Sequence, residues 1–329
     1  MTQMKASSNW QEQVSPDEPA RHELFAEQLG RIQASGNRKV GLGRALHRKQ
    51  VVAAKAVLTV EAGLPQHAAQ GLFAEPGEFE VLARLSNGSP NVQRDVVPDI
   101  RGFAFSVRGV RGESALGGTT NRQDFLLINR AAFGLRSSEE FAEVVLGAAK
   151  GPLGIVKALN ARYGPLRGPV ELAKLLAESA RPFSGFATTT FHSAAPIQMG
   201  PYAGHVRMVP RGNRLSPSAQ LGFGNEMIQR LRDSAVGFDV YVDFFVDEEV
   251  TPIEDGSKEW PVDDIPSVKV ATLVLGTQDV ESAEGQQFSE SVAADKFDPW
   301  SALADHRPLG EIMRARKVAY FKSQQARGA

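Results

Sequence analysis

The chain has 329 residues, of which 42% are hydrophobic and 23% charged, a composition that suits a globular protein with a sizeable core. The formal net charge of −1 creates no overall basic field, so neither nucleic acid nor a membrane is expected as a partner. Cysteine is absent, which excludes disulfides, thiolate nucleophiles and cysteine-ligated metals. Any bound metal must therefore be held by histidine, tyrosine or carboxylate.

Residues 1–25 are polar, with acidic residues at Asp17 and Glu18 and no periodic apolar positions. This texture predicts a flexible N-terminal arm, followed by one domain over residues 26–329. The arm lacks the apolar segment of a secretory signal, and no stretch of about 18 apolar residues occurs anywhere in the chain. We therefore expect a cytoplasmic protein.

Short β-prone runs, separated by Gly, Pro, Asn or Asp clusters, occur on both sides of a helical middle third. The middle third opens with a Ser-x-x-Glu capping box from Ser137 to Glu140, and further helices are predicted from Leu153 and Val170. A helix at Glu226–Arg232 lies among the later strands. The predicted strands are Val51–Val60, Phe79–Leu85, Ile100–Val107, Phe125–Ile128, Ala187–Phe191, His205–Val209, Val240–Val246 and Val268–Leu275.

This order of elements predicts an α+β fold built on a closed antiparallel eight-stranded β-barrel with a helical insertion. Closure is favoured because it removes the exposed edges that an open sheet of this kind would have. The sequence contains no internal repeat and no low-complexity linker, which favours one domain over two.

The last predicted helix runs from Pro308 to Arg327, with Gly328 just past its end. Arg316, Tyr320 and Arg327 are spaced by four and seven residues, which places them within roughly 40° of one helical stripe. An arginine one turn before a tyrosine favours the phenolate, and a phenolate suits ferric iron. On the helix alone, a packed tyrosine among solvated arginines is the commoner interpretation.

The pattern Arg-x-x-x-Tyr-x-x-x-x-x-x-Arg resembles the proximal haem motif of catalases, which hold iron through a tyrosine. The segment from Arg44 to Lys49 is similar to the catalase segment that carries the distal histidine. The resemblance implies Tyr320 as axial iron ligand, assisted by Arg316, and His47 as the base that handles peroxide. Without the resemblance, the segment from Arg44 to Lys49 would be interpreted as an exposed basic turn.

Further segments resemble catalase motifs in the same order along the chain. Arg84-Leu85-Ser86-Asn87 is similar to the family's Arg-Phe-Ser-Thr, which implies that Ser86 orients His47. The resemblance implies that the haem propionates meet Arg44, Arg84 and Arg327. The other matching segments are Asp99–Ala104, Trp260–Pro261, Ile265–Pro266 and Phe297–Pro299.

One position departs from the catalase pattern. Catalases carry a distal asparagine thirteen residues before a phenylalanine that packs on the haem, and Phe133 is the match to that phenylalanine. Counting back from Phe133 gives Thr120, with Asn121 next to it, so both are candidate distal donors. A threonine offers one donor where an amide offers two, and Gln123 replaces the motif's proline. Haem binding is therefore better supported than fast peroxide turnover.

The resemblance implies a haem b enzyme of the catalase or peroxidase type, an oxidoreductase with a small peroxide substrate and a haem-bearing C-terminal helix. Because the chain ends at Ala329, we expect a core-only member without NADPH, assembled as a homodimer. The alternatives are a fatty-acid hydroperoxide-converting haem enzyme, a haem-binding or peroxide-sensing protein with little turnover, and a haem-free structural protein. The remaining histidines show no metal-ligand spacing.

Overall fold

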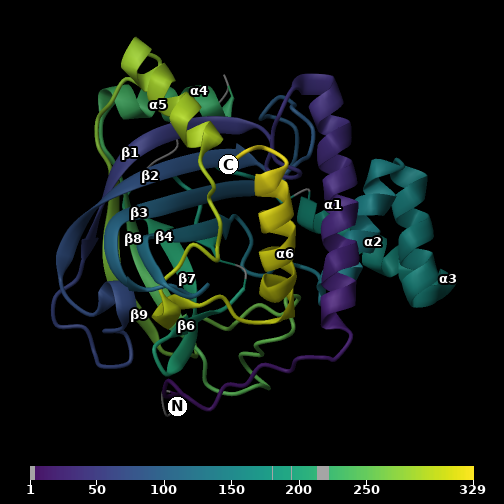
Figure 1. Cartoon of the computed structure of the whole chain (residues 1–329), viewed down its shortest axis with the longest axis horizontal. Coiled ribbons are helices and arrows are strands. Elements are labelled where there is room, and N and C mark those ends of the chain that lie inside the picture. The colour runs from purple at the N-terminus through teal and green to yellow at the C-terminus, as the bar shows by residue number, and fades with distance from the viewer. Residues whose placement is uncertain (1–3, 180, 194, 213–221) are drawn as a thin grey trace.

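The computed structural model describes residues 4–179, 181–193, 195–212 and 222–329 (Figure 1). The strands are β1 (Gln50–Val60), β2 (Gly77–Asn87), β3 (Arg101–Glu113), β4 (Thr119–Ile128), β5 (Phe191–His192), β6 (Ile197–Met199), β7 (Tyr202–Pro210), β8 (Val236–Phe244) and β9 (Ser267–Leu275). The helices are α1 (Glu18–Val40), α2 (Ser138–Ala149), α3 (Pro152–Ser179), α4 (Phe223–Asp233), α5 (Ala283–Ala294) and α6 (Glu311–Gln325).

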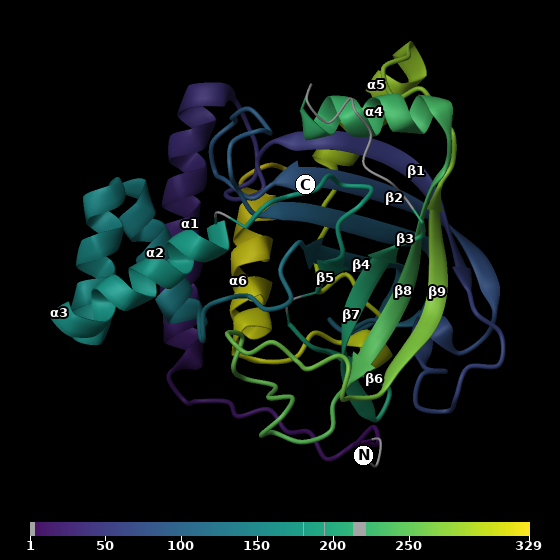
Figure 2. The ribbon, with the colours of Figure 1, turned by 180° about the vertical axis from the view of Figure 1, so that it is seen from behind.

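The strands form a closed antiparallel barrel, as the sequence predicted. Their order is β5-β4-β3-β2-β1-β9-β8-β7, and β5 pairs with both β4 and β7, so the eight strands make a ring. The short strand β6 extends the sheet beyond β7. Seen from behind, β7, β8 and β9 make the wall opposite α6 (Figure 2). The closing strand β5 is only two residues long, so closure rests on few backbone bonds.

Alternation of side chains along β2, β3 and β4 gives the barrel wall two different faces. Leu85, Phe103 and Phe125 belong to the large apolar cluster that fills the barrel. Because side chains alternate along a strand, the neighbouring Arg84 and Ser86 point to the outer face. Both are nevertheless buried, because α5 and the segment that joins it to α6 pack on this face. The outer face therefore offers buried polar side chains.

The helices pack outside the barrel (Figure 1). Helix α1 lies along α6, and a small apolar cluster containing Phe25, Ala315 and Ala319 joins them. Helices α2 and α3 pack against each other beyond α1, and the predicted cap of α2 is present, with Ser137 accepting a bond from the Glu140 backbone. No helix among the described residues is long and apolar enough to cross a membrane.

Several predicted boundaries need correction. Residues 187–190 form a turn, and only Phe191 and His192 pair as a strand. Helix α6 begins at Glu311 rather than Pro308, because Gly310 has a φ of 87° that a helix cannot contain. Helices α1 and α5 and strand β6 were not predicted.

The predicted N-terminal arm is more ordered than its composition indicated. Helix α1 already begins at Glu18, with Pro19 in its first turn. The preceding residues run along the barrel, where the Ser7 amide donates to the Phe245 carbonyl and Trp10 Nε1 donates to the Pro201 carbonyl. These bonds hold Ser7 and Trp10 in defined positions, although both belong to the segment predicted to be a flexible arm.

Arg314 connects three distant segments to the start of α6. Its guanidinium forms salt bridges with Glu12, Glu18 and Glu254, at 2.6, 2.7 and 3.1 Å. All four side chains are mostly buried. Hydrogen bonding and charge attraction from these carboxylates raise the pKa of Arg314 against the opposing effect of its burial. One arginine therefore holds the N-terminal segment, α1 and the 247–258 loop on α6.

We expect Arg314→Met to destabilise the fold by about 3 kcal/mol, because it leaves the mostly buried Glu18 and Glu254 without their cation and leaves Glu12 with Arg307 alone. Urea denaturation at neutral pH measures the loss. Arg31→Met, at an exposed position on α1, is the matched control and should change stability by no more than about 0.5 kcal/mol. Equal losses in the two variants would contradict the role assigned to Arg314.

Candidate functional site

His47 lies in the segment that leads into β1, on the outer face of the barrel. Its φ of 49° is in the left-handed region, which histidine adopts more readily than most residues but which still requires support. The His47 amide donates to the Gly88 carbonyl at 2.9 Å, and Nδ1 lies 3.0 Å from Ser86 Oγ. Backbone and side chain are thus both fixed by the end of β2.

Gly102 makes room for this histidine. It stands opposite Ser86 in the β2–β3 ladder, and a Cβ at this position would lie 2.6 Å from His47 Nδ1 and 2.7 Å from Ser86 Oγ. Any larger residue would push the imidazole away from the sheet. Within the segment that resembles the catalase Asp-x-Arg-Gly-Phe-Ala motif, the glycine therefore has a steric function.

Burial and three nearby arginines determine the charge state of His47. Burial of the imidazole, followed by repulsion from Arg84, Arg316 and Arg44, lowers the pKa of His47 to about 3. The imidazole is therefore neutral at physiological pH. In the tautomer in which Nδ1 donates its hydrogen to Ser86 Oγ, Nε2 is free to accept a proton.

Arg44, Arg84 and Arg327 form a cationic cluster beside His47. Arg84 donates to the His47 carbonyl at 2.8 Å, while Arg44 donates to the carbonyls of Ala293 and Asp295. The buried Nε atoms of Arg84 and Arg327 have no hydrogen-bond partner.

The three guanidiniums are close enough to repel one another. Burial, then repulsion from Arg44 and Arg327, lowers the pKa of Arg84, and burial with repulsion from Arg327 lowers the pKa of Arg44 to about 10. Among the described carboxylates, none forms a salt bridge with any of the three. Such a cluster is complementary to an anion that the protein itself does not provide.

Tyr320 lies on α6, facing the same cluster. Its phenol oxygen accepts a hydrogen bond from Arg316 Nη2 at 2.9 Å, and the guanidinium stacks over the ring with its carbon 5.1 Å from the ring centre. Arg316 also donates to Met313 Sδ at 3.3 Å. A charged donor on the phenol oxygen is an arrangement that stabilises negative charge there.

Electrostatic coupling links the two halves of the site. Tyr320 opposes the lowering of the pKa of both Arg44 and Arg84, and Arg316 acts on His47. The structure therefore brings together residues from the segment before β1, from β2, from α6 and from the residues just after α6. They are His47, Ser86, Arg44, Arg84, Arg316, Tyr320 and Arg327.

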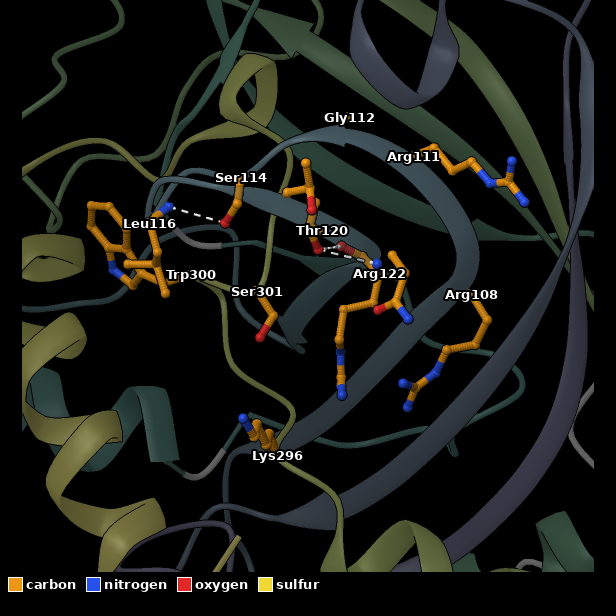
Figure 3. Close-up of a pocket in the computed structure, with 12 residues that line it drawn as sticks. Arg108, Arg111, Gly112, Ser114, Leu116, Thr120, Arg122, Lys296, Trp300 and Ser301 are labelled. Atoms are coloured by element: carbon orange, nitrogen blue, oxygen red, sulfur yellow. Dashed lines mark hydrogen bonds between the residues drawn. The ribbon is translucent and has the colours of Figure 1, made fainter.

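Thr120 and Asn121 are not brought to this cluster. They lie at the start of β4, eight residues before Ile128, which pairs with Gly102. At about 3.3 Å per residue this spacing is more than 20 Å along the strand. The Thr120 hydroxyl is bonded to the Arg122 backbone, and Asn121 is exposed. Both line a separate cavity, whose lining contains none of the clustered residues (Figure 3).

Phe133 follows β4 and packs against α2. Its ring centre lies 5.0 Å from that of Phe141, which belongs to the apolar contacts between α1 and α6. Phe133 is therefore on the α6 side of the molecule, although no described polar interaction connects it with the cluster.

The ring of eight antiparallel strands, with its polar outer face covered by a C-terminal helix, defines a catalase-like fold. No protein-family model and no curated protein matches the chain. Among solved structures, a fungal catalase matches with a TM-score of 0.64 and 16% identity, over 89% of this chain and 61% of that chain. A bacterial catalase matches with a TM-score of 0.66 and 15% identity, over 99% and 64% of the two chains.

Catalase A from Saccharomyces cerevisiae gives a TM-score of 0.64 and 15% identity, over 99% of this chain and 67% of that one. The chain thus spans between 61% and 67% of the length of these catalases. At such identities the likeness establishes the fold alone, so the function has to be argued from the site.

We expect Gly102→Ala to displace His47, because the added methyl group occupies the space of its Nδ1 and of Ser86 Oγ. Stability should fall by about 1–3 kcal/mol, as for other overpacked positions. Nitrogen NMR signals of the His47 ring should shift as the bond to Ser86 is lost. Gly276→Ala, where nothing lies within 4 Å of the new Cβ, is the control. Unchanged ring signals in Gly102→Ala would refute the steric function.

Proposed function

We propose that the protein is a haem-dependent, peroxide-decomposing oxidoreductase that acts on hydrogen peroxide or small organic hydroperoxides. The observation that carries this proposal is the pairing of a neutral, fixed His47 with a tyrosine whose oxygen is bonded to an arginine, beside three arginines that lack carboxylate partners. The catalase-like fold supports the proposal but does not establish it, since the identities are 15–16%.

The residues of the cluster fit a haem. Its two propionates would satisfy Arg44, Arg84 and Arg327, whose buried Nε atoms include two without partners. Tyr320 would hold the iron through its phenol oxygen, to which Arg316 already donates a charged hydrogen bond. A bound haem would supply the iron that weakens the O–O bond of the peroxide.

His47 would move the proton in this reaction. A neutral Nε2 would accept the proton from one peroxide oxygen and return it to the other, which prepares that second oxygen to leave as water. Ser86 would keep the ring in place during the transfer, and Arg84 would hold the His47 backbone. The low pKa of His47 keeps this base free of a proton at physiological pH.

A second candidate function is haem binding or peroxide sensing with little turnover. The position of Thr120 and Asn121 favours it, because neither donor lies beside His47 to orient a peroxide. The two candidates predict the same cofactor and different rates of peroxide consumption.

For the cofactor, we expect Tyr320→Phe to lose the tyrosinate features of the ferric spectrum when the full chain is loaded with haem. Removing the phenol oxygen removes the proposed ligand atom, which accepts a hydrogen bond from Arg316. Tyr241→Phe, on β8 under Arg207, is the matched control and should keep the spectrum of the parent protein. An identical spectrum for Tyr320→Phe would show that another group ligates the iron.

For the reaction, we expect His47→Gln to slow peroxide consumption by about 100-fold or more while haem absorbance is retained, because a general base is lost. Because the folded pKa of His47 is lowered to about 3, the parent protein should show no loss of rate near the usual histidine value of 6.5 as pH falls. His67→Gln, outside the cluster, is the control. Full activity in His47→Gln would eliminate the proposed base, and a haem protein with negligible consumption would favour the sensing alternative.

A further inference from the structure

The cavity that Thr120 and Asn121 line opens between the β3–β4 hairpin and the segment 296–301 (Figure 3). Its volume is about 820 Å³, within the range of small-molecule sites. The lining comes from the outer ends of both strands and from the chain that leads into α6. None of the residues assigned to the haem cluster lines it, so it has to be explained separately.

The wall of this cavity is cationic. It contains Arg108, Arg111, Arg122 and Lys296 and no carboxylate. Asp295, behind the wall, accepts from Arg108 and Arg122, and Asp124 forms a further salt bridge with Arg122. In the described part of the chain, neither Arg111 nor Lys296 forms a salt bridge. Four positive charges therefore face two negative ones, and two cations remain unpaired.

The cavity also has an apolar side. Trp300 and Leu116 lie together across from Arg108 and Arg111 (Figure 3). The indole is held firmly, since Trp300 Nε1 donates to the Met313 carbonyl at 2.7 Å and the Lys317 ammonium lies over its ring. Because Trp300 is almost fully buried, the exposed apolar contact on this side comes mainly from Leu116, which the fixed indole supports.

Uncharged polar groups complete the lining. Ser301 lies between the cationic and the apolar sides (Figure 3), and Asn121 also lines the cavity, so both add hydrogen-bonding capacity without charge. The lining is thus polar, apolar and positive in separate places, which is the pattern of a site for an amphipathic anion.

We propose that this cavity binds a small organic monocarboxylate. The carboxylate pairs with Lys296 and the neighbouring arginines, and the aromatic or aliphatic body lies against Trp300 and Leu116. A bare inorganic anion would leave the apolar side without contact, and an uncharged molecule would leave the two free cations without a partner. The proposal goes beyond the haem reaction and does not depend on it.

Isothermal titration calorimetry on the full chain tests this proposal with four probes. Phenylacetate represents aromatic acids and hexanoate aliphatic ones, while 2-phenylethanol lacks the charge and inorganic phosphate lacks the apolar body. We expect at least one acid to bind about tenfold or more tightly than both controls. The alcohol loses the charged hydrogen bond, and phosphate loses the apolar contact. The stronger acid identifies the ligand class. Equal binding of phosphate or of the alcohol would overturn the proposal.

Variants connect the binding to this cavity. Lys296→Met and Arg111→Met should each weaken the acid by about tenfold, with unchanged melting temperatures because both side chains are exposed and unpaired. Lys157→Met and Arg167→Met, exposed on α3, are the matched controls and should bind normally. Tyr320→Phe should also bind normally, so that failure of the haem proposal remains distinguishable. Unchanged affinity in both cavity variants would place the acid elsewhere and refute the site.

Discussion

The outer face of β2 and β3 is the constraint on which the site depends. Strand alternation sends Leu85 and Phe103 into the barrel and leaves Arg84 and Ser86 outside, where a covering helix buries them. A one-residue change of register would exchange these faces and destroy core and site together. The barrel therefore fixes the position of His47 indirectly, because its bond to Ser86 and its space above Gly102 both require this register.

Helix α6 is held in place by polar contacts rather than by strand register. Helix α6 carries Tyr320, and its first turns are held by Arg314 and by Glu311, which accepts from Ser138 and lies 3.0 Å from His22 Nε2. Hydrogen bonds from His22 and Ser138 outweigh burial and lower the pKa of Glu311 to about 2, so this carboxylate stays charged. Polar contacts thus set the position of α6 along its axis. The small apolar side chains of Ala315 and Ala319 would not by themselves prevent the helix from shifting along α1.

Local patterns were predictable from the sequence, and spatial relations were not. The shared stripe of Arg316 and Tyr320 follows from helical periodicity, and their bond was expected from a spacing of four. The steric function of Gly102 required the pairing of β2 with β3, which no local pattern contains. Helix α1 was missed because its buried face mixes the apolar Phe25 and Ala26 with the polar Glu18, His22 and Gln33, and because its stability comes from packing on α6. The distance from Asn121 to His47 depends on strand register, which counting along the chain cannot provide.

The arginines around Arg314, Arg122 and Arg84 form three groups that differ in how many carboxylates neutralise them. This number indicates what each group does. Arg314 has three carboxylate partners, so its group is structural. Arg122 pairs with Asp124 and shares Asp295 with Arg108, which leaves Arg111 and Lys296 beside an open cavity with a modest excess of positive charge. Arg44, Arg84 and Arg327 form no described salt bridge, and burial followed by repulsion from neighbouring arginines lowers the pKa of Arg44 and of Arg84. Since a buried cation without a salt-bridge partner is costly, this last group has the strongest need for an external anion, and the two propionates of the proposed haem would meet that need where a single carboxylate would not.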